Sequence, residues 1–250
     1  MTDWAAVSHK IEQALALTKT PVAVTFTDSA PSGSAAPAAS VPAGCSFWEL
    51  GANSNLATEA SHHRHCAIGI HTHNLAGAPE SQQHELETAL GAMQGLDYVR
   101  PSEVQALPVI HTPHRYVLYG PLSEAASTPD VVLLFARASQ GLVVTEALTR
   151  VDGEVPSVMG RPACALVPQV VNGGRSVSSL GCCGARAYLD ALSDEMALWG
   201  LRGDRLEAYA EEIEGLSKAN SVLTQFHELR RAAVEAGETP TVEDSLARLQ

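Results

Sequence analysis

Cysteines are the residues of this 250-residue chain that most clearly could do chemistry. Cys45, Cys66 and Cys164 stand singly, whereas Cys182 and Cys183 are adjacent. No Cys-x-x-Cys motif is present, so neither a zinc ribbon nor a thioredoxin-type redox pair is indicated. Thiols that lie on separate loops can still converge in space. Four thiolates suit a tetrahedral zinc ion or a cubane cluster, and three would leave one iron open to substrate.

Histidines form the second candidate group, and five of them crowd within twelve residues around Cys66: His62, His63, His65, His71 and His73. His111 and His114 add a separate pair. Imidazoles can ligate zinc, copper or iron, or relay protons near neutral pH. The cluster lacks a His-Glu-x-x-His core, so at least three of the five are interpreted as exposed bystanders. His63 and His65 are close enough in sequence to share the environment of Cys66.

Arg186 is the third candidate, because it ends the run Gly181-Cys182-Cys183-Gly184-Ala185-Arg186 between a predicted strand and a predicted helix. Backbone N–H groups at a helix start favour an anion and lower the pKa of a nearby thiol. Arg186 could bind a carboxylate or phosphate group of a substrate. The alternative is a structural arginine paired with an acidic residue. The chain has no nucleotide-binding glycine motif and no Gly-x-Ser-x-Gly nucleophile elbow.

Hydrophobic periodicity predicts the elements that must position these residues. Helices are expected where apolar residues recur at helical spacing, near residues 4–15, from about 79 to 93, over 139–149 and over 206–229. Strands are expected at residues 22–26, 116–119, 131–135 and 176–180. The run 131–135 is continuously apolar, as in a strand that is buried on both faces.

Two segments are expected to lack regular structure. Residues 29–44 are almost entirely Ser, Ala, Pro and Gly, which predicts a flexible surface loop. Residues 236–250 are interpreted as a loose C-terminal tail. The body of the protein is therefore expected at residues 1–235, as a single domain.

The cysteines also produce a weak internal repetition. The strand after Pro21 is followed by Cys45 and, 21 residues later, by Cys66. The strand after Pro129 is followed by Cys164 and, 18 residues later, by Cys182. This spacing is explained either by an old duplication with two facing halves or by chance, since the two stretches share negligible identity.

Composition limits the classes of partner. Apolar residues make up 45% of the chain, enough for one sizeable core. The formal net charge of −12 argues against a nucleic-acid-binding face. The start of the chain lacks a signal-peptide pattern, and no run of 18 apolar residues predicts a membrane span. We therefore expect a cytoplasmic protein without structural disulfides.

An ordered series of motifs resembles the DUF169 family, an uncharacterised group from bacteria and archaea. The resemblance spans roughly residues 5 to 230 and rests on Cys45-Ser46-Phe47-Trp48, His63, Cys66-Ala67-Ile68-Gly69, Gly120-Pro121-Leu122, Pro129-Asp130-Val131-Val132-Leu133, Cys164 and Gly181-Cys182-x-Gly184-x-Arg186. It implies that four cysteine positions recur and that Cys183 is an extra. It supplies no reaction. The Ala/Pro-rich stretch and the histidines around Cys66 look peculiar to this chain.

These observations lead to one hypothesis. We expect a single mixed α/β domain, and the sequence leaves undecided whether it consists of two pseudo-symmetric halves. We expect this domain to hold a 4Fe-4S iron–sulfur cluster through Cys45, Cys66, Cys164 and Cys182. A cluster is favoured over zinc because structural zinc ligands usually come in close sequence pairs. His63 and Arg186 would protonate and orient a small anionic substrate in redox, Lewis-acid or sulfur-transfer chemistry, as in an oxidoreductase or a lyase.

Two alternatives belong to other classes. One is a non-enzymatic zinc- or haem-binding sensor that uses the Cys/His-rich segment. The other is a protein without a cofactor, whose cysteines fill core space as buried free cysteines commonly do. A homodimer is compatible with all of these hypotheses, whereas nucleic acid and membrane are not expected as partners.

Overall fold

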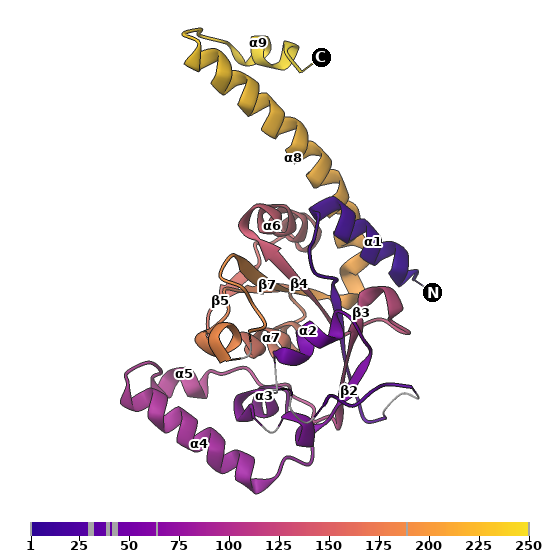
Figure 1. Cartoon of the computed structure of the whole chain (residues 1–250), viewed down its shortest axis with the longest axis vertical. Coiled ribbons are helices and arrows are strands. Elements are labelled where there is room, and N and C mark those ends of the chain that lie inside the picture. The colour runs from indigo at the N-terminus through magenta and orange to yellow at the C-terminus, as the bar shows by residue number, and fades with distance from the viewer. Residues whose placement is uncertain are drawn as a thin grey trace.

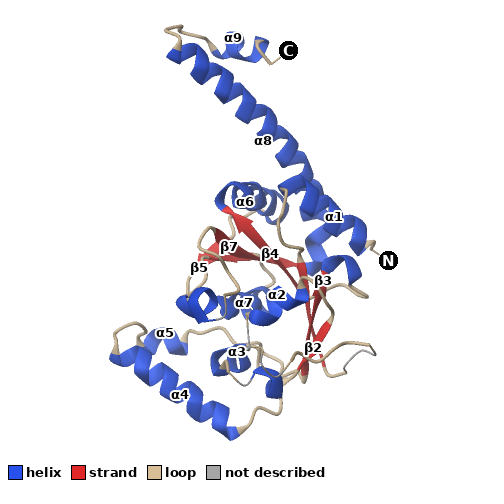
Figure 2. Cartoon of the chain, viewed as in Figure 1, coloured by secondary structure: helices blue, strands red, loops and turns tan. Residues whose placement is uncertain are grey.

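One mixed β-sheet organises the computed structural model, which describes residues 2–29, 33–38, 41, 45–63, 65–188 and 190–249 (Figures 1 and 2). Its strands run in the order β2 (Leu56–Thr58), β3 (Tyr116–Pro121), β1 (Val22–Thr27), β4 (Val131–Arg137), β7 (Met196–Arg202), β6 (Val177–Ser179) and β5 (Ser157–Met159). Neighbouring strands are antiparallel except β5 and β6, which are parallel. The predicted mixed α/β class is therefore confirmed.

Helices cover both faces of this sheet (Figure 2). One face packs against α1 (Trp4–Leu15), α6 (Ala138–Asp152) and the first part of α8 (Leu206–Glu235). The other face carries α2 (Ser46–Gly51), α3 (Ala67–Thr72) and α7 (Leu166–Gly173), and α4 (Glu80–Gly95) and α5 (Pro101–Gln105) lie outside α3 (Figure 1). Short 3₁₀ turns are η1 (Ala60–His63), η2 (Leu122–Glu124), η3 (Ala163–Ala165) and η5 (Gly203–Arg205), and η4 (Gly184–Tyr188) is a π-helical turn.

Strand β4 shows why the sheet separates two cores. Its side chains alternate, so Val131, Leu133 and Phe135 enter the core beneath α2, α3 and α7. Val132 and Leu134 enter the core beneath α1, α6 and α8. Each such side chain contributes about 1.5–3 kcal/mol when it is fully buried. The prediction of a strand buried on both faces is confirmed.

The register of the central strand pair is two-fold symmetric. The first residue of β1 pairs with the third residue of β4, and the third residue of β1 pairs with the first residue of β4: the pairs are Val22–Leu133, Ala23–Val132 and Val24–Val131. The pairing is therefore the same when the two strands are exchanged. The flanking strands continue this relation, since β3 pairs with β1 as β7 pairs with β4.

The outer strands β2 and β6 follow the same relation. Leu56 of β2 pairs with Tyr119 of β3, and Val177 of β6 pairs with Gly200 of β7. Tyr119 and Gly200 are themselves opposite Val24 and Leu133. The chain order β1–β2–β3 in the first half thus corresponds to β4–β6–β7 in the second. This topology agrees with two facing halves.

The segment expected to be a loose tail contains a short helix, α9 (Val242–Ala247). Thr241 and Asp244 form a capping box, in which the Thr241 side chain accepts a hydrogen bond from the Asp244 N–H, and α9 contacts α8. The outer part of α8 projects from the body, and α9 lies alongside its end (Figure 1).

Part of the expected loop at 29–44 lies outside the described residues. Within it, residues 29, 33–38 and 41 are described, and Ala35 forms an isolated β-bridge with Leu56. Helices α1, α4, α6 and α8 and strands β1, β3, β4 and β6 occur at their predicted places. No helix of the described chain is both long and apolar enough to cross a membrane.

Candidate metal centre

Four cysteines from four separate segments line one cavity of about 200 Å³. Cys45 directly precedes α2, and Cys66 is the N-cap residue of α3. Cys164 lies in η3, immediately before α7, and Cys182 lies two residues before η4. The structure therefore brings together the four thiols that the sequence singled out, and their role as ligands stays a prediction.

The four thiols form two pairs that follow the two-fold relation of the sheet. Cys45 precedes β2 and Cys164 precedes β6, and both side chains are buried, with 4% exposed. Cys66 follows β2 and Cys182 follows β6, and both are half-buried. Each half of the chain thus contributes one deeply buried thiol and one thiol nearer the surface.

The backbone around the half-buried pair is held by local interactions. The Sγ atom of Cys66 accepts a hydrogen bond from the Gly69 N–H at 3.3 Å. Gly181, just before Cys182, has a φ of +84°, and a Cβ atom there would meet Leu192 Cδ2 at 2.5 Å. Only glycine fits this turn, which carries the chain from β6 to Cys182.

Arg186 fixes the loop that bears Cys182. Its guanidinium donates to the carbonyl oxygens of Leu180 at 2.6 Å, Leu192 at 3.3 Å, Met196 at 3.1 Å and also Ser193. A carboxylate oxygen of Asp194 lies 3.7 Å away. These contacts match the structural alternative considered for Arg186, and its predicted contact with an anionic substrate is not tested.

Burial favours the protonated thiol at Cys45, Cys66 and Cys164 when no cation is near. It raises the pKa of Cys45, and the charges of the neighbouring thiols raise it further. Burial likewise raises the pKa of Cys164 and of Cys66, although hydrogen bonds from Thr72 and Gly69 act in the opposite direction. A bound cation would reverse this balance, because metal ligation favours the thiolate.

Tyr119 brings a polar group to the same region. It is buried in β3, with its ring centroid 6.1 Å from that of Phe47. Burial raises the pKa of its hydroxyl, and the charges of Cys45, Cys164 and Cys66 raise it further. The hydroxyl has no hydrogen-bond partner among the described residues. Sequence reasoning missed Tyr119, because only strand pairing brings it beside the thiols.

His63 lies in the core rather than on the cavity wall. Its Nε2 atom is 3.0 Å from the Thr58 hydroxyl, and its ring packs edge-on against Phe47 with centroids 4.8 Å apart. Burial lowers the pKa of His63, which favours the neutral ring. His65 lines the cavity together with Glu85 and Tyr188, two residues that sequence reasoning missed.

The other histidines lie at different places. The Nδ1 atom of His62 accepts from the Glu59 N–H, His73 is buried with its Nδ1 atom 3.1 Å from the Thr72 hydroxyl, and His71 is exposed on α3. His114 Nδ1 is 4.0 Å from an Asp28 carboxylate oxygen, and the His111 N–H bonds Asn172.

Comparison with known proteins agrees with the motif series. A family model described as "Uncharacterised ArCR" matches residues 10–212, which include all five cysteines. The chain belongs to the DUF169 family. No curated protein and no solved structure matches it. The match ends within α8, so the projecting part of α8 and α9 of this DUF169 protein lie beyond the matched region.

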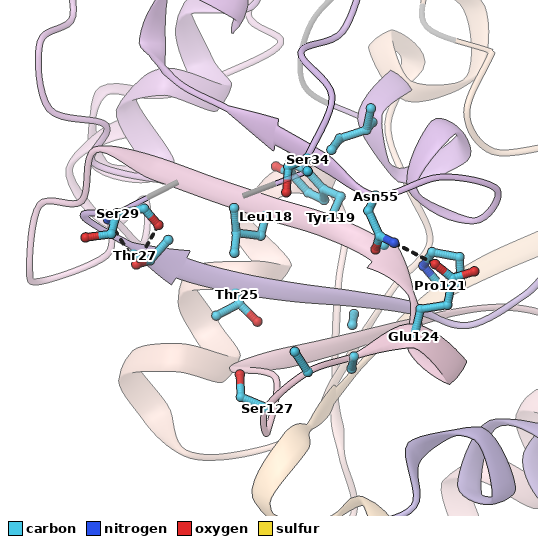
Figure 3. A pocket seen from close by; sticks show the side chains of 16 residues that line it. Thr25, Thr27, Ser29, Ser34, Asn55, Leu118, Tyr119, Pro121, Glu124 and Ser127 are labelled. Carbon is cyan, nitrogen blue, oxygen red and sulfur yellow. Dashed lines mark hydrogen bonds between the residues drawn. The ribbon is translucent and has the colours of Figure 1, made fainter. Parts of the chain in front are cut away.

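The DUF169 chain has a second cavity on the other face of the sheet, of about 450 Å³ (Figure 3). Thr25 and Thr27 point into it, because they alternate along β1 with Val24 and Phe26, which belong to the core on the cysteine side. Its carboxylate, Glu124, already accepts a hydrogen bond from Asn55 at 2.6 Å. The described residues of its lining include no cysteine or histidine, so they offer fewer reactive groups than those of the thiol cavity.

Proposed function

We propose that this DUF169 protein holds an iron–sulfur cluster through Cys45, Cys66, Cys164 and Cys182 and acts on a small molecule beside it. One observation carries the proposal: four thiols from four segments line a single cavity, in two pairs related by the fold. Cysteines that only fill core space would have no reason to meet in this way. A shared ligand explains both the convergence and the pairing.

The residues present fit such a group. The candidate donor set is all sulfur, as iron–sulfur clusters require. Each thiolate of a cubane binds a different iron atom, so the four sulfurs lie further apart than around a single zinc ion, whose Zn–S bonds are about 2.3 Å. Within the described residues, no three His, Cys, Asp or Glu side chains are grouped closely enough to hold one metal ion. The wider spacing of a cubane is compatible with this arrangement.

The surroundings of the thiols also suit a buried cluster. Ala163, Ala185 and Ile68 give the cavity apolar walls. The Gly69 N–H already points at Cys66 Sγ, and the Tyr119 hydroxyl is a buried donor without a partner among the described residues. Hydrogen bonds to sulfur are among the interactions that set the potential of a cluster.

The cysteines, His65 and Arg186 would have separate roles in this site. A bound cluster supplies electron transfer or, where one iron lacks a thiolate, a Lewis-acid site for redox or sulfur-transfer chemistry. Cys45 and Cys164 would hold its buried side and Cys66 and Cys182 its outer side. We assign proton transfer to His65 rather than His63, because His65 is exposed and lines the cavity. Arg186 would act by positioning Cys182.

Metal analysis of the anaerobically purified or reconstituted protein tests the proposal. We expect about four iron and about four sulfide per chain with broad visible absorption, as for a cubane. Single Ala variants of Cys45, Cys66 and Cys164 should lose most of the iron. Cys183→Ala is the matched control, because Cys183 is exposed and does not line the thiol cavity.

The same samples separate the alternatives. One zinc ion per chain without iron would support the zinc-site hypothesis instead of the cluster. A Soret band would support haem binding. Wild-type protein that holds neither iron nor sulfide after reconstitution would refute the cluster, as would equal losses in Cys183→Ala and in the other variants.

A further inference from the structure

A smaller cavity of about 180 Å³ adjoins the thiol cavity. The two share lining residues, namely Ile68, Pro162, Cys182 and Gly184. Cys182 is the only one of the four candidate ligands that borders both cavities. A molecule in the smaller cavity would therefore approach the Cys182 side of the centre.

The lining of this cavity is mostly aliphatic. Leu90 and Met93 come from α4, Val104 from α5, and Val99 and Leu107 from the segments on either side of α5. Its volume is below the roughly 300–1,000 Å³ of pockets that hold drug-sized ligands. The cavity thus suits a small molecule whose surface is largely apolar.

The charged residues at its edge neutralise each other. Arg161 Nη2 lies 3.6 Å from a Glu103 carboxylate oxygen and also donates to the Tyr98 carbonyl. The Arg161 guanidinium carbon stacks 4.3 Å from the Tyr98 ring centroid. Because the one cation and the one anion of the described lining already pair with each other, the cavity offers a charged ligand no unpaired opposite charge.

The cavity arises where the two halves of the chain differ. Helices α4 and α5 lie between Cys66 and β3, whereas η4 is the only helical turn described between Cys182 and β7. The loop between these helices reaches the second half, because the Tyr98 hydroxyl lies 3.5 Å from Cys183 Sγ. Helices α4 and α5 help to enclose the space beside Cys182, and the described residues between Cys182 and β7 contain no equivalent helices.

We infer that this apolar cavity is a binding site for a small, uncharged, largely apolar molecule, held beside Cys182. Its identification as the substrate site rests on the proposed function, whereas binding itself does not. The inferred ligand differs from the anionic substrate that Arg186 suggested, since the Arg186 donors face backbone carbonyls.

Fluorine NMR on the full chain tests the site with fluorobenzene as the probe. We expect saturable binding to the wild-type protein and at least tenfold weaker binding to Leu90→Trp, which fills the cavity. Leu96→Trp, at the exposed end of α4 with 80% of its surface accessible, is the control and should bind as the wild type does. The anion 4-fluorobenzoate should bind at least tenfold more weakly than fluorobenzene.

Circular dichroism checks that each variant is folded, and Val104→Phe replaces Leu90→Trp if the latter is not. Absence of saturable fluorobenzene binding to the wild type, equal affinity in the filled variant, or tighter binding of 4-fluorobenzoate would overturn the inference.

Iron and sulfide are measured on the same samples. Binding of fluorobenzene without a cluster would refute the proposed function alone and leave the cavity as a ligand site. In protein that holds a cluster, fluorobenzene should change the electron paramagnetic resonance spectrum of the reduced cluster. An unchanged spectrum with the cavity filled would refute the placement beside the centre.

Discussion

Buried polar side chains give this protein its most sensitive positions at the residue scale. Cys45, Cys164, Tyr119, His63 and His73 all lie in the core on the cysteine side of the sheet or at its edge. Burial without a charged partner favours the neutral form of a group, so it raises the pKa of a thiol or a phenol and lowers the pKa of an imidazole. The shifts predict how the protein responds to pH and to substitution.

His73 should make the fold sensitive to acid. Burial lowers its pKa from 6.5 to about 4. Between these values the unfolded chain binds the proton and the folded chain does not, so the free energy of unfolding should fall as the pH drops from about 6.5 to about 4. For His73 alone the upper limit of this loss of unfolding free energy is about 3 kcal/mol. Burial also lowers the pKa of His63, so His63 contributes a further loss in the same direction. Urea unfolding across this range measures it.

His73→Phe is the matched variant, because Phe fills similar space and cannot take a proton. Its unfolding free energy should depend less steeply on pH than that of the wild type. An identical slope in both proteins would show that His73 is not the responsible group.

Tyr119→Phe should act on the centre rather than on the fold. The hydroxyl has no partner among the described residues, so its removal should change the unfolding free energy of the metal-free chain by less than about 1 kcal/mol or raise it. In cluster-loaded protein the loss of a donor near sulfur should lower the reduction potential. Redox titration of both proteins measures this shift. An unchanged potential would show that the hydroxyl does not contact the cluster.

Short loops, rather than long helices, position the thiols at the element scale. The Cys182 loop combines the Gly181 turn with the Arg186 contacts to carbonyl oxygens. Gly181 and Arg186 are close in sequence, but the residues that they contact, Leu192 and Met196, can be identified only from the folded structure.

Arg186→Lys should destabilise the protein by about 2–4 kcal/mol. A lysine ammonium cannot reproduce the planar fork that spans several carbonyl groups, and bonds to a charged donor contribute about 1.5–3 kcal/mol each. Arg150→Lys is the control, since Arg150 forms an exposed pair with Glu212 at 3.1 Å. Chemical denaturation compares the two. Equal effects of both substitutions would contradict a structural role for Arg186.

Sequence patterns predicted long elements well and short ones poorly. The apolar run of β4 and the helical spacing of α1 are strong local signals. Strands β2 and β5 have three residues each, too few to show a period. Strand β7 was missed because Met196-Ala197-Leu198-Trp199 favours neither a helix nor a strand clearly, and its pairing with β4 decides the outcome.

The candidate site was predictable only in part, for the same reason. Cysteine types and positions pointed to a common centre, and the four thiols do line one cavity. The cavity beside Cys182 was not foreseen, because its walls depend on α4 and α5 of the first half meeting Arg161 of the second.

The whole molecule consists of a two-fold body with a projecting helical arm. The arm comprises the outer part of α8 and α9, and it lies beyond the family match (Figure 1). Within the body, α8 packs against α1 and α6 through Leu206, Tyr209 and Ile213.

A chain ending at residue 221 should therefore keep the body intact. We expect its unfolding free energy to stay within about 1 kcal/mol of the wild type, because the removed residues add little to the two cores. A chain ending at residue 210 loses Ile213 and should be destabilised by several kcal/mol. Thermal and urea unfolding compare the two. Loss of iron from the longer chain would show that the arm contributes to the centre.

The paired placement of the thiols has a mechanical consequence. Each half supplies two of them, so a group bound by all four would tie the halves together across the β1–β4 pair. It would act as a cross-link that closes long loops and restricts the unfolded chain, much as a disulfide does. The loaded protein should then resist unfolding more strongly than the metal-free chain, whose two halves stay joined by the shared sheet and the two shared cores.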